Sequence, residues 1–165
     1  TAKAFHKAGA DVTTIAGFRN KDLVILEEDF KEVSDAYYLM SDDGSAGEKG
    51  LVTNKLEELI LNGEKFDRVI AIGPVIMMKF VCLTTKKYNI PTIVSMNPIM
   101  IDGTGMCGGC RLKVDGKMQF ACVDGPDFDG HLVDFDEAMS RNMAYRDFEL
   151  HEREATCNLL KREVQ

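Results

Sequence analysis

The sequence predicts an α/β fold: an open parallel sheet with helices on both faces, then a small β-hairpin domain and a C-terminal helix. Residues 10–98 alternate β-branched segments with amphipathic ones, residues 99–110 are rich in glycine and cysteine, and the chain from Asp134 is charged and lacks proline. Strands that alternate with helices of about ten to fifteen residues are typical of covered parallel sheets. We therefore expect domains at 1–98, 99–133 and 134–165.

The first domain begins with the end of a helix, because Thr1–Lys7 leads to Gly9, and glycine commonly follows a helix C-terminus. Clusters of β-branched and aromatic residues predict strands at 11–17, 35–40, 66–72 and 91–96. Apolar residues at helical spacing, or Pro74 at a favourable first position, predict helices at 21–33, 51–61 and 74–88. Since the chain opens inside a helix, we expect that a strand and its turn precede Thr1.

Turns with candidate ligand-binding residues follow the first three predicted strands, and ligands of such sheets bind beyond the carboxyl ends of the strands. The residues are Gly17 and Arg19, then Asp42, Asp43 and Gly44, then Gly73, Pro74, Met77 and Met78. Arg19 could meet a pyrophosphate, and the two aspartates could accept from ribose hydroxyls while repelling a 2′-phosphate. Each turn also has an alternative interpretation without a ligand: a solvated Arg19, an ordinary polar turn at the aspartates, and a Gly-Pro pair that simply ends a strand. Together they predict a dinucleotide site that favours NAD(H) over NADP(H).

Three of the five cysteines and one carboxylate lie close together in the second domain. Asp102, Cys107, Cys110 and Cys122 form the pattern D-x4-C-x2-C-x11-C, which with a first cysteine would be that of plant-type [2Fe-2S] clusters. The surrounding glycines let the backbone wrap closely and direct N–H groups at sulfur. Asp115-Gly116 predicts a hairpin that returns Cys122 to the other thiols. The pattern predicts an iron–sulfur site.

Other interpretations of this loop stay open. Zinc could be held by the three cysteines with Asp102 or His131, giving a zinc-stabilised interaction module without redox function. A thioredoxin-like dithiol would need a helix after the Cys-x-x-Cys pair, and simply buried cysteines would not need four glycines. Cys82 and Cys157 are expected to be small core or surface residues on helices. The amphipathic C-terminal segment could pack on its own domain or on a partner.

Composition excludes several functional classes. The net charge is −7 and there is no basic stripe, which argues against nucleic acid as a partner. No apolar run approaches the length of a membrane span, and nothing resembles a signal peptide. An odd number of cysteines, three of them among glycines, suits a reducing compartment. We expect a cytoplasmic protein.

These motifs together resemble the nucleotide-binding and iron–sulfur end of the ferredoxin-NADP reductase superfamily over nearly the whole chain. The order of the two domains is similar to the dihydroorotate dehydrogenase electron-transfer subunit group. Within that group, Asp102 and the runs 107–111 and 120–126 are similar to the small-subunit (alpha) family of NADH-dependent reduced ferredoxin:NADP+ oxidoreductases, which includes sulfide dehydrogenases. Orotate-type subunits carry four cysteines at this site, so Asp102 counts against an orotate assignment.

The resemblance implies that the ligands of a [2Fe-2S] cluster are Asp102, Cys107, Cys110 and Cys122. It also implies NAD(H) at the three turns, and FAD held largely by a β-barrel that this group has before the nucleotide domain and this chain lacks. We expect a C-terminal piece of an oxidoreductase subunit, inactive as a reductase alone and without a catalytic nucleophile or acid. The subunit would pass electrons between NAD(H), FAD and the cluster to a larger catalytic flavin/iron–sulfur subunit, with ferredoxin as an indirect partner. A dihydroorotate dehydrogenase partner is the alternative.

Overall fold

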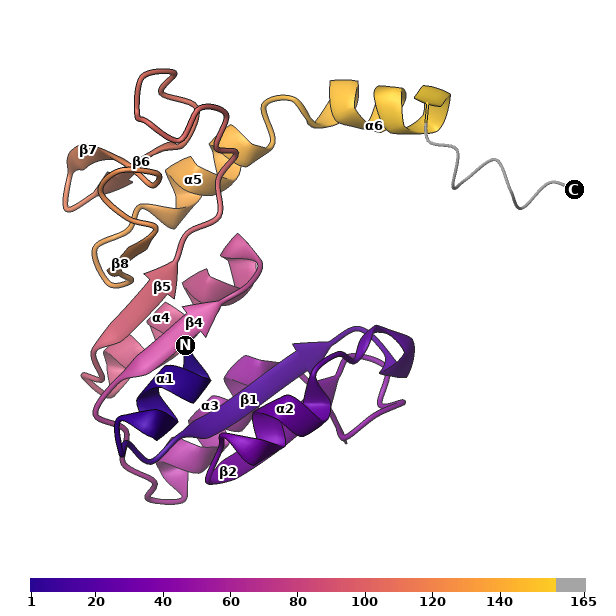
Figure 1. The fold of residues 1–165 in the computed structure, drawn as a ribbon, viewed down its shortest axis with the longest axis vertical. Coiled ribbons are helices and arrows are strands. Elements are labelled where there is room, and N and C mark those ends of the chain that lie inside the picture. Colours follow the sequence, from indigo (N-terminus) through magenta and orange to yellow (C-terminus); the bar gives the residue numbers. More distant parts are fainter. Residues whose placement is uncertain (157–165) are drawn as a thin grey trace, which may run out of the picture. The chain divides into compact units, whose positions relative to one another are not determined.

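The computed structural model describes residues 1–156 and separates the chain into two compact units, Thr1–Phe66 and Asp67 onward. Each unit contains parallel strands with helices between them, which confirms the predicted α/β class (Figure 1). The domain boundaries expected after residues 98 and 133 stay predictions. Cys157 and the last part of the predicted C-terminal helix lie outside the described residues.

The first unit has one three-stranded parallel sheet in the order β1-β2-β3. Its elements are α1 (Ala2–Lys7), β1 (Thr13–Phe18), the 3₁₀ turn η1 (Lys21–Leu23), α2 (Glu27–Glu32), β2 (Ala36–Ser41), β3 (Glu48–Lys49) and α3 (Val52–Leu61). β1 and β2 pair in parallel from Thr13 opposite Ala36 to Phe18 opposite Ser41. Gly9 has a φ of +83° just after α1, as the predicted helix end requires.

Helices of the first unit lie against opposite faces of β1. The Thr14 hydroxyl contacts the Ser34 hydroxyl just beyond α2 at 2.6 Å. Gly17 faces the first residue of α3, and a Cβ added to Gly17 would lie 2.5 Å from Cγ1 of Val52. Because successive strand residues point to opposite faces, Thr14 and Gly17 mark the two sides of the sheet. Gly17 thus permits the close approach of α3.

The second unit has a mixed sheet and a separate hairpin. β4 (Val69–Ile72) pairs in parallel with β5 (Thr92–Ser95), which pairs in antiparallel fashion with β8 (Asp127–Asp129). The hairpin joins β6 (Arg111–Val114) and β7 (Lys117–Phe120). The helices in the described part of this unit are α4 (Val75–Lys87), α5 (Phe135–Asn142) and α6 (Arg146–Thr156). Asp115 and Gly116 both have positive φ angles, 50° and 73°, which confirms the hairpin turn predicted from Asp-Gly.

Helix α4 covers one face of the mixed sheet. Met78 and Val94 are fully buried, and Cys82 is 5% exposed. A side chain at Gly130, just after β8, would overlap Sγ of Cys82 and come within 2.8 Å of Val94. His131 then contacts the buried Thr85 hydroxyl of α4 through Nε2 at 3.1 Å. The segment that follows the hairpin is therefore packed against α4.

The structure differs from the sequence prediction in three places. The helix expected at 21–33 is divided into η1 and α2, because Leu26 adopts a left-handed conformation with φ 55° and the side chain of Asn20 caps only the short turn. The short strands β3 and β8 were not predicted. The C-terminal segment breaks between Asn142 and Arg146.

The two C-terminal helices differ in packing. α5 buries Phe135 and Ala138 and contacts α4 and β6, so it packs on its own domain, with an ion pair of 2.6 Å between Lys79 of α4 and Asp136. α6 buries no side chain.

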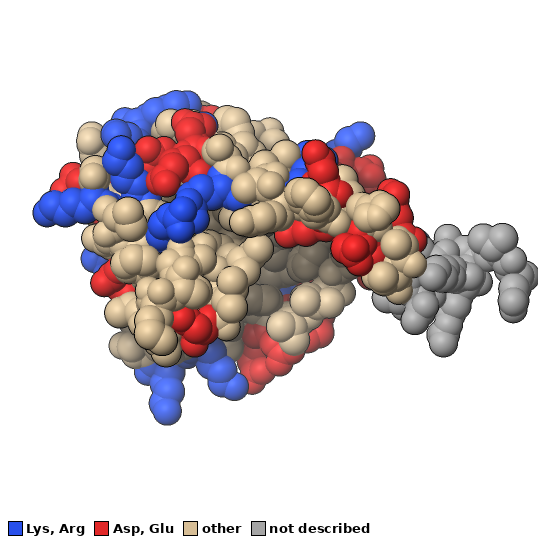
Figure 2. Space-filling model, turned by 90° about the horizontal axis from the view of Figure 1, so that it is seen from above, with Lys and Arg blue, Asp and Glu red and all other residues tan. Residues whose placement is uncertain are grey.

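Figure 2 shows acidic and basic side chains interspersed on the visible face. Among the described residues, no helix has the length and apolar character needed to cross a membrane.

Candidate metal centre and nucleotide turns

Asp102 organises the start of the cysteine loop. Its Oδ1 accepts a hydrogen bond from the backbone N–H of Thr104 at 2.9 Å, and its Oδ2 accepts one from the N–H of Cys107 at 2.8 Å. These hydrogen bonds lower the pKa of Asp102 below its ordinary value, and the one from Thr104 has the largest effect. The carboxylate is thus ionised at neutral pH and keeps free lone pairs, because a carboxylate can accept about four hydrogen bonds.

The hairpin brings Cys110 and Cys122 together. Cys110 directly precedes β6 and is 1% exposed, and Cys122 lies two residues beyond β7. The two sulfur atoms are 3.2 Å apart. The Cys110 thiol, followed by burial, raises the pKa of Cys122, whereas the Gly105 N–H acts in the opposite direction. The hairpin therefore returns Cys122 to Cys110, one of the two other thiols to which its return was predicted.

Cys107 lies in a more exposed part of the loop. Its sulfur accepts a hydrogen bond from the Gly109 N–H at 3.4 Å. Between residues 1 and 156, no three side chains of His, Cys, Asp or Glu are arranged as a group that could hold a metal ion. The structure forms two associations instead, Asp102 with the backbone of Cys107 and Cys110 with Cys122. The convergence of all four ligands stays a prediction.

Two charged residues that were not predicted from the sequence form side-chain hydrogen bonds to the backbone of this loop. Nη1 of Arg111 donates to the carbonyl of Gly108 at 3.1 Å, between Cys107 and Cys110. Oδ2 of Asp124 accepts from the N–H of Phe120 at 2.7 Å, across the turn that contains Cys122. Their places in the sequence were a usable signal, because aspartate commonly closes short turns and Arg111 adjoins Cys110.

The residues present fit an iron–sulfur cluster in their donor chemistry. Three thiols supply soft anionic ligands once deprotonated, and Asp102 supplies an ionised oxygen donor. Backbone N–H groups of Gly105 and Gly109 already act on two of the sulfur atoms. Hydrogen bonds to sulfur are one means by which proteins tune such clusters. The same donors also suit zinc, and His131 is directed at Thr85 rather than at the thiols.

The turns after β1 and β2 lie side by side. The backbone N–H groups of Asp42 and Asp43 donate to the carbonyls of Phe18 and Arg19 at 3.1 and 3.4 Å. Asp43 accepts from both the N–H and the hydroxyl of Ser45, which lowers its pKa. Asp42 and Arg19 are exposed. Asp43 therefore shapes the turn that contains Gly44, and Asp42 presents its carboxylate to solvent beside Arg19.

The third turn belongs to the second unit. Gly73 has a φ of 155°, and a Cβ there would lie 2.6 Å from the terminal methyl of Met77. Pro74 is the N-cap of α4, and the side-chain amide of Asn97 lies 3.4 Å from the Gly73 carbonyl. Met78, on the buried face of α4 near its start, is completely buried in the core of the unit. Gly73, Pro74 and Met77 are the accessible members of this turn.

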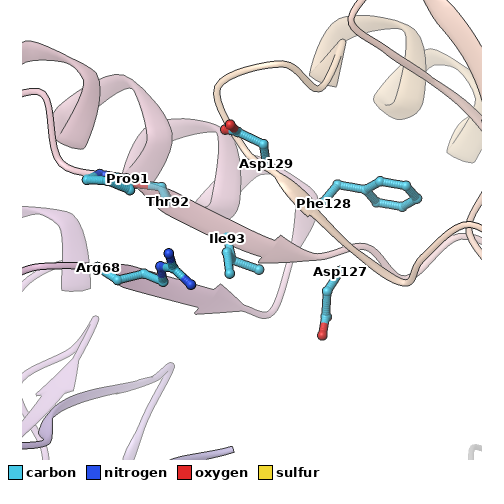
Figure 3. Close-up of a pocket in the computed structure, with 7 residues that line it drawn as sticks. All are labelled: Arg68, Pro91, Thr92, Ile93, Asp127, Phe128 and Asp129. Atoms are coloured by element: carbon cyan, nitrogen blue, oxygen red, sulfur yellow. The ribbon is translucent and has the colours of Figure 1, made fainter. Parts of the chain in front are cut away.

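A hollow of about 300 Å³ lies elsewhere in the second unit (Figure 3). It lies beside Ile93 on the sheet, with Arg68 just before β4 and Asp127 and Asp129 on β8. Register pairs Asp127 with Ser95 and Asp129 with Ile93, so these side chains share one face of the sheet. None of the predicted site residues lines this hollow.

The thiols should differ in reactivity in the metal-free protein. Burial raises the pKa of Cys82 to about 12, so its thiolate fraction at pH 8 is about one in ten thousand. Cys107 is exposed. With limiting iodoacetamide at pH 8, peptide mass spectrometry should find that, among the four cysteines that the structure describes, Cys107 is labelled first and Cys82 last. Labelling of Cys82 as fast as Cys107 would contradict the packing of α4 described above.

Comparison with known proteins identifies the class. Residues 97–134 match the family model of the iron–sulfur cluster binding domain of dihydroorotate dehydrogenase B. The chain is 51% identical over 148 residues to a Thermotoga maritima protein named dihydroorotate dehydrogenase B (NAD(+)), electron transfer subunit homolog, covering 90% of this chain and 52% of that one. It is 43% identical over 131 residues to a probable electron transfer subunit of the same enzyme in Methanocaldococcus jannaschii, covering 79% and 49%. The chain belongs to this electron transfer subunit family.

A solved structure narrows the relationship. The NADH-dependent reduced ferredoxin-NADP oxidoreductase, solved in work on flavin-based electron bifurcation, superposes with a TM-score of 0.83 and 49% identity. The match covers 93% of this chain and 55% of that chain. The resemblance to this oxidoreductase family is thereby confirmed. The chain spans about half the length of the curated relatives it matches.

Proposed function

We propose that this chain is the nucleotide-binding and iron–sulfur part of an electron-transfer subunit of a flavin-dependent ferredoxin-NADP+ oxidoreductase. In this function electrons pass between NAD(H), FAD and a [2Fe-2S] cluster to a larger catalytic subunit, with ferredoxin as an indirect partner in the cytoplasm. The observation that carries the proposal is the Cys110–Cys122 thiol pair, 3.2 Å apart, in a loop that matches an iron–sulfur binding domain. When bound, such a cluster accepts and releases single electrons.

The chain's own residues have separate tasks in this proposal. Cys107, Cys110, Cys122 and Asp102 hold the cluster, and the N–H groups of Gly105 and Gly109 stabilise sulfur. Asp42 accepts from the ribose hydroxyls of NAD(H), with Arg19 near the pyrophosphate and Asp43 fixing the turn. The exposed carboxylate of Asp42 disfavours a 2′-phosphate through charge repulsion, and hence NADP(H). Gly73 and Pro74 leave backbone accessible to a planar ring. FAD is bound largely by residues outside this chain.

Metal analysis tests the proposal against its rival. The full chain, purified without oxygen, is expected to contain about two iron atoms and two inorganic sulfides per chain. Zinc in about one equivalent, without iron or visible absorbance, would instead support a zinc-stabilised interaction module. A dihydroorotate dehydrogenase partner shares the same cluster chemistry, and co-purification of the native partner subunit distinguishes it.

Asp102 allows a ligand-exchange prediction. Asp102→Cys should retain the cluster and move its reduction potential to a more negative value, because thiolate donates more electron density to iron than carboxylate does. Asp102→Asn keeps an oxygen that can accept from the N–H of Thr104 and serves as the control for loop structure. Redox titration followed by visible absorbance measures both variants. An unchanged potential in Asp102→Cys would count against Asp102 as a ligand.

A further inference from the structure

Arg111 holds the turn between two predicted cluster ligands. Its guanidinium donates to the carbonyl of Gly108 at 3.1 Å, and its backbone N–H is 3.4 Å from the same carbonyl. Arg111 lies opposite Phe120 in the hairpin register, on the exposed side of β6. A positive charge is therefore attached directly to the Cys107–Cys110 turn.

Asp124 closes the turn that contains Cys122. Its carboxylate accepts from the Phe120 N–H at 2.7 Å, and its own N–H donates to the Phe120 carbonyl at 2.8 Å. The Val123 N–H shares that carbonyl at 3.0 Å. Cys122 lies inside this closed turn, so a negative charge is attached to the last ligand.

We propose that Arg111 and Asp124 are positioning residues for the cluster ligands, and that their opposite charges shift the reduction potential of the cluster in opposite directions. The inference rests on the iron–sulfur function proposed above. Reduction adds one negative charge to the cluster. A nearby cation stabilises the reduced form and raises the potential, whereas a nearby anion lowers it.

Salt dependence separates this role from a purely structural one. Both side chains are exposed, so their electrostatic effect is screened as ionic strength rises. A variant that only loosens the loop would change cluster retention without such salt dependence. A variant that removes a charge should shift the potential more at low salt than at high salt.

The test uses the full chain with its cluster and redox titration at low and high salt. Arg111→Gln should lower the potential because it removes a positive charge, and Asp124→Asn should raise it because it removes a negative one. Asparagine keeps an acceptor for the Phe120 N–H, so the turn itself is retained. Arg111→Lys should stay close to wild type. Lys113→Gln is the matched control, because Lys113 is exposed two residues further along the same strand and face. Its loss should shift the potential less than Arg111→Gln does.

The outcomes are distinguishable. Opposite, salt-dependent shifts support the inference, whereas shifts of the same sign, or none, overturn it while leaving the proposed function intact. If Arg111→Gln loses its cluster, retention by Arg111→Lys supports the positioning role, and loss from both overturns the role of the charge. Absence of a cluster from the wild-type chain overturns the proposed function and, with it, this inference.

Discussion

Cys122→Ser is expected to abolish cluster binding, with iron and visible absorbance falling at least tenfold below wild type. Cys122 forms half of the thiol pair with Cys110, and the hairpin places it there at 3.2 Å. Serine has nearly the same size but is a poor ligand for iron, because its hydroxyl does not ionise at neutral pH. Iron and sulfide analysis after anaerobic purification, with circular dichroism to verify the fold, measures the effect.

Cys82→Ala is the matched control for this prediction. Cys82 is a cysteine of the same unit, on the buried face of α4 and packed against Gly130, away from the cysteine loop. Its loss should leave cluster content unchanged and cost about 1 kcal/mol of stability through a small cavity. Full cluster retention in Cys122→Ser, or equal loss in both variants, would contradict the assignment of Cys122 as a ligand.

Gly47→Ala is expected to destabilise the first unit by about 3 kcal/mol and to weaken NADH binding. Gly47 has a φ of +61°, and an added Cβ would overlap the carbonyl oxygen of Leu39 and lie 2.6 Å from its carbonyl carbon. Backbone atoms of β2 cannot move aside as a flexible side chain could, so the loop that carries Asp42 and Asp43 must shift. Urea unfolding and NADH titration measure the two effects.

Gly9→Ala separates the cost of the backbone conformation from that of the overlap. Gly9 also has a positive φ, +83°, but no atom lies within 4 Å of a Cβ added there. Alanine at residue 9 should therefore cost only about 1 kcal/mol, the usual cost of a left-handed conformation. If Gly47→Ala were no more destabilising than Gly9→Ala, the close approach of the loop to Leu39 would be refuted.

Local sequence patterns predicted the fold class and most of its elements. The hairpin followed from Asp115-Gly116, because that dipeptide provides the two positive φ angles of the turn. The break at Leu26 could not be predicted, since 21–33 has helical spacing and only the observed left-handed conformation ends it. β8 was missed because three residues gain strand geometry only by pairing with β5.

The candidate site was predictable in its donors and only partly in its contacts. Spacing indicated which thiols could meet, and the structure brings Cys110 and Cys122 together. The spacing of residues in the sequence could not reveal that both oxygens of Asp102 accept hydrogen bonds from backbone N–H groups, because such contacts depend on the loop conformation. Likewise, Asp42 and Asp43 look equivalent in sequence, but only Asp43 is bonded to Ser45.

The most direct test of the central claim is electron paramagnetic resonance of the full chain after anaerobic purification and reduction with dithionite. If the loop holds a [2Fe-2S] cluster, the reduced chain gives a rhombic or axial signal that integrates to about one unpaired electron per chain and disappears in Cys122→Ser. A reduced wild-type chain without this signal, containing zinc instead of iron, would contradict the account.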